Sequence, residues 1–259
     1  MRKKIGLVLG AGGARGFCHI GVIEVLQENN IPIDIVTGCS MGALIGGGFA
    51  AGISSKEMHE VANRVTTRTV FDVDLRNMFR GGIARGDRAM KLFKKYAGAN
   101  TRIENSNIKF AAIAADMRKH KLHVFKTGLI WEAVRASISI PALFRPVEHN
   151  GMLLVDGGVL KRMPISEARD LGADIIIAVD AIGSPRELTS NSTLRVLDAA
   201  YQSMDWRSAQ HEGRDADILI IPELENRSSF IFRNNDEAIQ TGREAAIRTL
   251  PSIKKLISN

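Results

Sequence analysis

The sequence predicts an α/β fold built around a largely parallel β-sheet, and two features of the chain support this. Along most of its 259 residues, short apolar runs bounded by turn residues alternate with segments of helical periodicity, which is the pattern of successive β-α-β units. Residues 175–179 form an unbroken Ile-Ile-Ile-Ala-Val run, as expected of a parallel strand buried on both faces. Because no linker, repeat or low-complexity tract divides the chain, we expect a single domain over residues 1–259.

In the first part of the chain, two apolar runs each lead into a glycine-rich turn. Residues 5–9 are predicted to form the first strand, and residues 17–27, beyond a glycine loop, have the apolar spacing of a helix. Residues 33–37 are predicted to form the second strand. They lead into Gly38-Cys39-Ser40-Met41-Gly42 and then into a helix of small residues.

The remainder of the chain predicts further strands and helices. Strands are predicted at residues 108–115, 122–125, 152–155, 175–179 and 218–221. Helices are predicted at residues 131–137 and 236–250. The first of these helices ends before Pro141, since the residue that precedes a proline disfavours helical geometry.

The segment from about residue 62 to residue 105 fits the alternation less well, and we call it the basic segment. Within residues 62–99 it carries the basic residues Arg64, Arg68, Arg76, Arg80, Arg85, Arg88, Lys91, Lys94 and Lys95. The acidic residues there are Asp72, Asp74 and Asp87, and the larger apolar ones include Phe71, Met78, Phe79, Leu92 and Phe93. Two interpretations stay open: an amphipathic helical excursion with a solvated face, or a lipid-facing flap or lid.

Charge and cysteine content restrict the partners and the compartment. The chain has 35 Lys+Arg against 28 Asp+Glu, a formal net charge of +7. This surplus indicates an acidic partner, and nucleic acid, an anionic membrane and an acidic substrate all fit. Two cysteines, Cys18 and Cys39, cannot form a disulfide framework, which favours a reducing compartment.

Two stretches resemble a signal peptide and a membrane-spanning segment. Residues 1–14 combine a basic start with an apolar run, but the run is rich in glycine and alanine and Arg15 follows without a cleavage pattern. Residues 35–55 are uncharged over a length near that of a membrane span, yet they contain six glycines and several hydroxyl side chains. We expect both to be buried parts of a soluble fold, and the protein to be cytoplasmic.

A first candidate site is Gly38-x-Ser40-x-Gly42, placed between a predicted strand and a predicted helix. A serine on such a sharp turn is held in a strained conformation with its hydroxyl exposed, and flanking glycines avoid collisions. The following helix adds a favourable dipole. The alternative is a tight turn in which Ser40 only caps the helix. We expect neighbouring Cys39 to point away from the exposed tip.

A second candidate is the glycine loop Gly10-Ala11-Gly12-Gly13-Ala14-Arg15-Gly16, which follows the first strand. Successive backbone N–H groups at a helix start form a concavity for an anion. A dinucleotide fingerprint would need glycine where Arg15 stands, and the phosphate-loop Gly-Lys-Ser/Thr is missing. An oxyanion hole for an ester carbonyl attacked by Ser40 fits the same shape. Adjacent parallel strands would bring the loop beside Ser40.

A third candidate is Asp156-Gly157-Gly158, at the end of the strand predicted for residues 152–155. By itself this is a common turn, but at the carboxyl end of a strand, beside the other two motifs, Asp156 suits a general base. The histidines show no metal-ligand spacing, so we predict no metal site and no cofactor. For His19, on the helix after the glycine loop, packing is the expected role.

Taken in order, the glycine loop with Arg15, the serine turn and Asp-Gly-Gly resemble patatin-like phospholipases, most closely the small bacterial single-domain members. Further support comes from Ala136-Ser137-x-Ser139-x-Pro141-x-x-Phe144-x-Pro146. The resemblance implies a three-layer α/β sandwich and a Ser–Asp dyad without histidine, with Ser40 as nucleophile and Asp156 as base. It places the oxyanion hole at Gly10, Gly12 and Gly13, supported by Arg15, Gly16, Gly38, Gly42, Gly157 and Gly158. The chain departs from the family pattern at Arg162, where asparagine is frequent.

The expected function is therefore a serine lipid acyl hydrolase acting on a lipid or acyl ester. Phospholipid, lysophospholipid, monoacylglycerol and acyl-thioester substrates all stay open, as does the oligomeric state. The rival mechanism is a Ser-His-Asp triad using His211, which lies in a polar stretch typical of a surface. The rival classes are a nucleotide- or nucleic-acid-binding protein and a non-catalytic regulator.

The positive charge has a more specific interpretation in this context. Only two Trp and two Tyr are present, few for stacking on nucleobases, which makes nucleic acid a poor candidate partner. We expect the basic cluster between Arg64 and Lys95 to contact an anionic membrane, peripherally at the inner membrane face.

Overall fold

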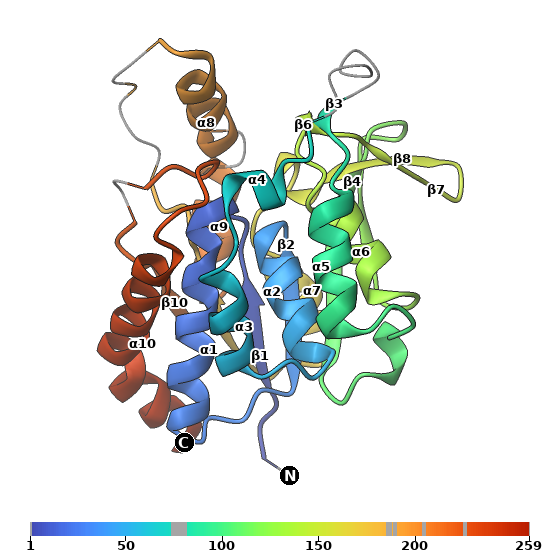
Figure 1. The fold of residues 1–259 in the computed structure, drawn as a ribbon. Coiled ribbons are helices and arrows are strands. Elements are labelled where there is room, and N and C mark those ends of the chain that lie inside the picture. Colours follow the sequence, from blue (N-terminus) through green and yellow to red (C-terminus); the bar gives the residue numbers. More distant parts are fainter. Residues whose placement is uncertain are drawn as a thin grey trace.

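The computed structural model describes residues 2–73, 82–184, 188, 191–203, 206–224 and 227–258, and its centre is a β-sheet (Figure 1). Within these residues eight strands are joined in the order β10-β9-β1-β2-β4-β8-β7, with β5 also pairing with β4. The parallel strands are β1 (Ile5–Leu9), β2 (Ile35–Cys39), β4 (Lys109–Asp116), β9 (Ile175–Val179) and β10 (Ile218–Ile220). The antiparallel ones are β5 (Lys121–Phe125), β7 (Val147–His149) and β8 (Met152–Asp156).

Helices cover both faces of this sheet. The longer ones are α1 (Cys18–Glu28), α2 (Met41–Ala50), α3 (Ser55–Ala62), α5 (Asp87–Ala97), α6 (Ile130–Ser137), α8 (Thr193–Ser203), α9 (Trp206–Gly213) and α10 (Asn235–Ser258). The short ones are α4 (Thr67–Val70), α7 (Ile165–Asp170) and the 3₁₀ turns η1 (Gly13–Phe17), η3 (Ile103–Asn105) and η4 (Gly157–Val159). A separate parallel pair is formed by β3 (Gly82–Ala84) and β6 (Ala142–Phe144).

The strand side chains alternate between two apolar cores. Leu7 and Leu9 of β1 face a core shared with α1, α2 and α10, whereas Val8, between them, joins α7 and α9 on the opposite face. This alternation follows from the two-residue period of a strand. The predicted α/β fold with a largely parallel central sheet is therefore confirmed.

Several boundaries differ from the sequence prediction. The second strand was expected at residues 33–37 but is Ile35–Cys39, because Gly38 and Cys39 still pair with β4 while Asp34 is held by Arg2 and the Ile5 N–H. The last helix, expected to stop at residue 250, continues through Pro251 to Ser258. Helices α3, α7, α8 and α9 and strands β3, β6 and β7 were not predicted.

The described part of the basic segment contains α4, β3, α5 and η3. Helix α5 is amphipathic: Met90, Phe93 and Ala97 are buried, while Arg88, Lys91 and Lys95 are exposed. Its neighbours are α2, α4 and α6. Five residues named in the sequence analysis, Asp74, Arg76, Met78, Phe79 and Arg80, fall in 74–81, outside the described residues. Among the residues that are described, no helix is both long and apolar enough to cross a membrane.

Candidate active site

Ser40 occupies a strained turn between β2 and α2. Its backbone adopts φ 54° and ψ −122°, a region that a residue with a side chain rarely occupies. The flanking glycines are required sterically, because a Cβ at Gly42 would collide with the backbone of Leu9 and Gly10, and one at Gly38 with that of Ala43. Ser40 stands at the N-cap position, yet its side chain makes no capping hydrogen bond. The capping alternative therefore does not explain the turn.

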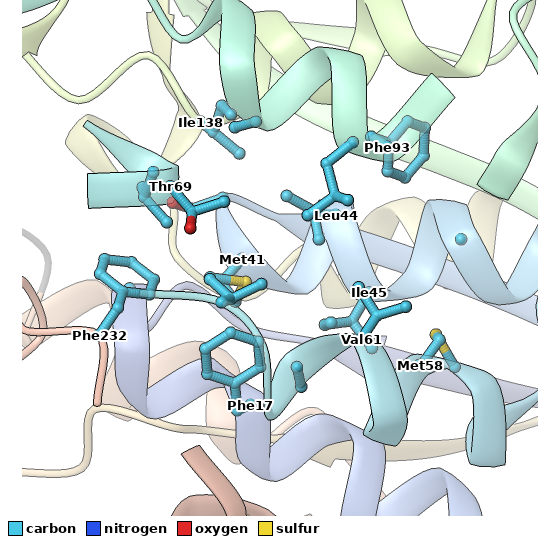
Figure 2. Close-up of a pocket in the computed structure, with 18 of the residues that line it drawn as sticks. Phe17, Met41, Leu44, Ile45, Met58, Val61, Thr69, Phe93, Ile138 and Phe232 are labelled. Carbon is cyan, nitrogen blue, oxygen red and sulfur yellow. The ribbon is translucent and has the colours of Figure 1, made fainter. Parts of the chain in front are cut away.

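The Ser40 residue is only 2% exposed, so the expectation of a hydroxyl open to solvent is wrong. Ser40 instead lines an apolar cavity of about 980 Å³, a volume that includes its open mouth. Helices α2, α3, α4 and α5 supply most of the walls, and Figure 2 shows their side chains converging on one space. Representative lining residues are Phe17, Met41, Leu44, Ile45, Met58, Val61, Thr69, Leu92, Phe93, Tyr96, Ile138 and Phe232.

Asp156 is completely buried at the end of β8. Its Oδ1 atom accepts the Gly158 N–H at 2.8 Å and a longer contact from the Cys39 thiol at 3.8 Å, while its Oδ2 atom has no hydrogen-bond partner. Burial raises the pKa of Asp156 to about 7, against the opposing effects of the Ser40 side chain, the Gly158 N–H and the Cys39 thiol. A buried carboxylate with one unpaired oxygen and this pKa is characteristic of a functional group.

The direction of the strand that carries Asp156 differs from the one expected. Strand β8 is antiparallel to β4, so Asp156 does not lie at the carboxyl end of a parallel strand. Strand β4 lies between β2 and β8, pairing its Ile113 with Cys39 and its Ala114 with Asp156. This register brings the serine turn and the carboxylate to the same level of the sheet. Gly157 is required there, since a Cβ would press on the Ile113 carbonyl at 2.7 Å.

Cys39 is buried and does not contribute to the cavity wall. Its thiol points toward Asp156 rather than into the cavity that Ser40 lines. The expectation that Cys39 points away from the tip agrees with this placement, although the contact with Asp156 was not foreseen.

The end of α6 and the residues directly after it hold both members of the predicted dyad. The buried Ser137 Oγ accepts the Ser40 N–H at 2.9 Å, and the Ser139 carbonyl accepts the Asp156 N–H at 2.9 Å. Neither serine was assigned a role from the sequence. The signal was present in Ala136-Ser137-x-Ser139, which served only to support the family resemblance.

The glycine loop contributes fewer free donors than expected. The Gly10 N–H donates to the Val179 carbonyl at 3.0 Å and so extends the sheet, and the Ala11 N–H donates to the Arg162 carbonyl at 2.9 Å. Gly10 therefore has no N–H to offer an oxyanion, which corrects its expected role as a donor.

The N–H groups of Gly12 and Gly13 differ from that of Gly10. Among the described residues no hydrogen bond uses the N–H of either. Gly13 has φ +53° and lines the same cavity as Ser40. A Cβ at Gly13 would collide with the Ser229 backbone, and one at Gly12 would lie 2.8 Å from the Ala181 side chain. This loop lies beside the serine turn, as expected, because β1 and β2 pair in parallel.

His19 packs beneath the glycine loop and hydrogen-bonds to it. It is fully buried, and its Nε2 donates to the Gly10 carbonyl at 2.8 Å. Burial lowers the pKa of His19 to about 4, so the ring is neutral near pH 7. His19 thus has the packing role expected of it. His211, the candidate for a triad, is exposed on α9.

Two buried arginines anchor the loops around the site. Arg15, only 1% exposed, donates to the Arg227 carbonyl at 2.6 Å. Arg162 forms a buried ion pair with Asp180 at 2.7 Å, and its carbonyl accepts the Ala11 N–H. The backbone of Arg162 thus joins the loop after Asp156 to the glycine loop, and the side chain that departs from the family pattern ties this loop to Asp180, just after β9. Gly16 permits close packing of this loop on Met41.

We find no group of three or more His, Cys, Asp or Glu side chains suited to a metal ion within the described part of the chain. A mostly parallel sheet with a strained serine between its second strand and the next helix places the protein in the class of mixed α/β proteins with a serine elbow. The sequence pattern of the patatin-like phospholipase family matches residues 7–169. Since this is more than half of the chain, the protein belongs to the patatin-like phospholipase family.

Relatives and solved structures extend the comparison. An uncharacterized NTE family protein of Mycobacterium tuberculosis is 38% identical over 181 residues, which cover 70% of this chain and 50% of that protein. The Lysophospholipase NTE1 of Yarrowia lipolytica is 29% identical over 88% of this chain and 16% of its own length. The chain thus spans about half the length of the mycobacterial relative and a smaller share of the yeast one.

Among solved structures, VipD from Legionella pneumophila is similar with a TM-score of 0.55 and 16% identity, covering 97% of this chain and 67% of VipD. ExoU of Pseudomonas aeruginosa, solved as the ExoU–SpcU complex, gives 0.52 and 13%, covering 100% of this chain and 52% of its own. At these low sequence identities, the similarity shows a shared fold and nothing further.

Proposed function

We propose that the protein is a serine lipid acyl hydrolase in which Ser40 is the nucleophile and Asp156 the general base. The observation that carries the proposal is the fully buried Asp156, whose Oδ2 has no partner and whose pKa is raised to about 7, near a strained serine that faces an apolar cavity. A group with a pKa near 7 accepts a proton from serine more effectively than a free aspartate, whose pKa is about 3.9.

The reaction proceeds by acyl transfer in two steps. Asp156 accepts the Ser40 hydroxyl proton as Ser40 Oγ attacks the ester carbonyl, and the N–H groups of Gly12 and Gly13 stabilise the oxyanion. The proton passes to the departing alcohol as the carbon–oxygen bond breaks, leaving an acyl-serine. Water, deprotonated by Asp156, then attacks the acyl carbon. The bond from this carbon to Ser40 Oγ breaks, the carboxylic acid leaves, and the proton passes from Asp156 to Ser40 Oγ. One oxyanion donor typically lowers the barrier by about 3 kcal/mol.

The cavity supports a lipid acyl group as the substrate part that enters. Its lining is almost entirely apolar and includes Ser40 and Gly13, so an alkyl chain buried there would place its ester carbonyl beside the proposed nucleophile. The name of the Yarrowia lipolytica relative indicates the lysophospholipid class among the esters to be tried.

Replacing Ser40 by alanine tests this function. We expect the wild-type protein to hydrolyse acyl esters and lysophospholipid, and Ser40→Ala to lose at least 10³-fold in kcat, a change of about 4 kcal/mol in barrier. Hydrolysis should be followed by fatty-acid release, with circular dichroism to show that the variant is folded. An active Ser40→Ala protein, or a wild-type protein inert toward every ester, would favour the non-catalytic regulatory or nucleotide-binding alternative.

We also propose that the exposed basic face of α5 contacts an anionic membrane. Arg88, Lys91 and Lys95 are exposed on the same helix whose Leu92 and Tyr96 line the cavity. A basic surface next to the cavity would bring its mouth to the lipid interface. The compartment that fits is the cytoplasm, at the inner membrane face.

Vesicle binding tests the membrane contact. Vesicles with acidic lipids should recruit the protein more strongly than neutral ones, and added salt should reduce the preference. Lys91→Glu with Lys95→Glu should weaken binding to acidic vesicles at least 25-fold, since each basic residue near such a surface contributes about 1 kcal/mol. Equal sedimentation of the protein with both kinds of vesicle would mean that the charge has no role at membranes.

A further inference from the structure

The cavity extends along α2, away from Ser40. Figure 2 shows Met41, Leu44 and Ile45 of this helix along one side, with Phe232 near one end and Phe93 near the other. Ser40 and Gly48 both line it, at opposite ends of α2. The proposed nucleophile and Gly48 therefore line the same cavity, and we call the part of it along α2 the groove.

Three consecutive glycines of α2 face three different neighbours. A Cβ at Gly46 would lie 2.7 Å from the Val36 side chain of the sheet, and one at Gly47 would lie 3.0 Å from Val134 of α6. Close packing therefore explains Gly46 and Gly47. Gly48 is different, because it faces the cavity.

Gly48 has room for a small side chain. A Cβ there would meet Ile53 Cδ1 at 3.3 Å, Met58 Sδ at 3.6 Å and Phe93 Cε2 at 3.9 Å. The nearest of these atoms is the end of a flexible side chain, and the other two lie at ordinary contact distances. Glycine within a helix is destabilising relative to alanine, and packing does not require it here. What the missing side chain provides is space at the far end of the groove, next to Met58 and Phe93.

The helix geometry gives the reach of the groove. From Ser40 to Gly48 is eight residues, which at 1.5 Å per residue is about 12 Å. An extended alkyl chain with C–C bonds of about 1.5 Å in a zigzag advances about 1.25 Å per carbon. A chain of about ten carbons would therefore reach Gly48 from the ester carbonyl.

We propose that Gly48, facing Met58 and Phe93, sets the acyl-chain length of the substrate by forming the end of the groove. The preferred ester carries an acyl chain of about ten carbons along α2. This inference rests on the proposed function and adds the residue that determines specificity. Because the end is defined by the contact of α2 with α3 and α5, a larger residue at 48 shortens the groove and a smaller one at 58 lengthens it.

A chain-length series on three proteins tests this. For the wild-type protein, kcat/KM on single-chain acyl esters of four to sixteen carbons should rise by up to about fourfold per CH₂ as far as about ten carbons, then fall for longer chains, which the closed end of the groove does not admit. Gly48→Leu should lower the ratio of the ten-carbon to the four-carbon rate at least tenfold. Gly48→Ala, the matched control in the same helix, should change this ratio much less.

Met58→Ala provides a second test in case leucine at position 48 prevents folding. It should move the end of the rise to longer chains, the opposite direction. A chain-length profile unchanged in both Gly48→Leu and Met58→Ala overturns the assignment of the groove end while leaving the proposed hydrolase intact. A wild-type protein that hydrolyses no ester of any length overturns both.

Discussion

Replacing Asp156 by asparagine is expected to lower kcat for ester hydrolysis by about 10²–10⁴-fold, the usual contribution of a general base. Asparagine has nearly the same shape but cannot accept the Ser40 proton. His211→Ala is the matched control and should retain activity, because His211 is exposed on α9. Steady-state kinetics on one acyl ester compare the three proteins. An active Asp156→Asn protein, or an inactive but folded His211→Ala protein, would contradict the dyad.

The same substitution should increase the stability of the fold. Burial raises the pKa of Asp156 to about 7, well above that of the unfolded chain. The folded state then binds a proton more tightly, so the free energy of unfolding decreases as pH rises from about 4 to about 7 and stays low above that range. Asp156→Asn removes this penalty, about 1.4 kcal/mol per pKa unit. Thermal unfolding at pH 8 should show a higher Tm for the variant, with the difference shrinking toward pH 4.

The catalytic activity should also depend on the ionisation of Asp156, but it should increase with pH where the stability decreases. The wild-type kcat/KM is expected to rise with pH through about 7, as Asp156 loses its proton and becomes able to act as base. The residual activity of Asp156→Asn should lack this inflection. Both pH profiles, of stability and of kcat/KM, would then have one cause. The ionised form of Asp156 destabilises the fold but is the form needed for turnover.

Gly42→Ala is the substitution with the largest expected effect on the fold. A methyl group at this position collides with the carbonyls of Leu9 and Gly10, which are part of β1 and of the glycine loop. Because backbone cannot move aside as a side chain does, we expect a loss of about 3 kcal/mol or more in the free energy of unfolding. Urea denaturation followed by circular dichroism measures it.

Gly48→Ala is the control for that experiment, since it places the same methyl group in the same helix. Its Cβ would meet only side-chain atoms, the nearest at 3.3 Å. The gain in helix propensity, up to about 1 kcal/mol, should leave this variant at least as stable as the wild type. Equal stability of the two alanine variants would mean that α2 and the glycine loop are not packed as described.

The serine turn and the glycine loop could be predicted from the sequence because both are local. Each follows a strand directly, and two parallel neighbours, β1 and β2, bring their ends to one edge of the sheet. The identity of the free donors could not be predicted in this way. Whether Gly10 offers its N–H depends on the neighbouring strand β9, whose Val179 carbonyl accepts it.

The position of Asp156 depends on long-range pairing that no local pattern reveals. Its strand runs antiparallel to β4, and only the register of Ala114 with Asp156 brings the carboxylate level with the serine turn. The support from Ser137 and Ser139 is likewise a contact between distant segments. The cavity was not predicted either. Its walls combine α2 with α3, α4 and α5. The small-residue helix α2 and the amphipathic character of the basic segment were expected, but their packing against each other and against α3 was not.

The central claim is that Ser40 is the nucleophile, and mapping a covalent adduct tests it most directly. An alkyl fluorophosphonate should form one adduct per chain, and fragmentation of the labelled peptide should place the phosphonyl group on Ser40 rather than on neighbouring Cys39. Labelling should be absent in Ser40→Ala and slow in Asp156→Asn. An adduct on Cys39 or on any other residue, in a protein that hydrolyses esters, would contradict the account.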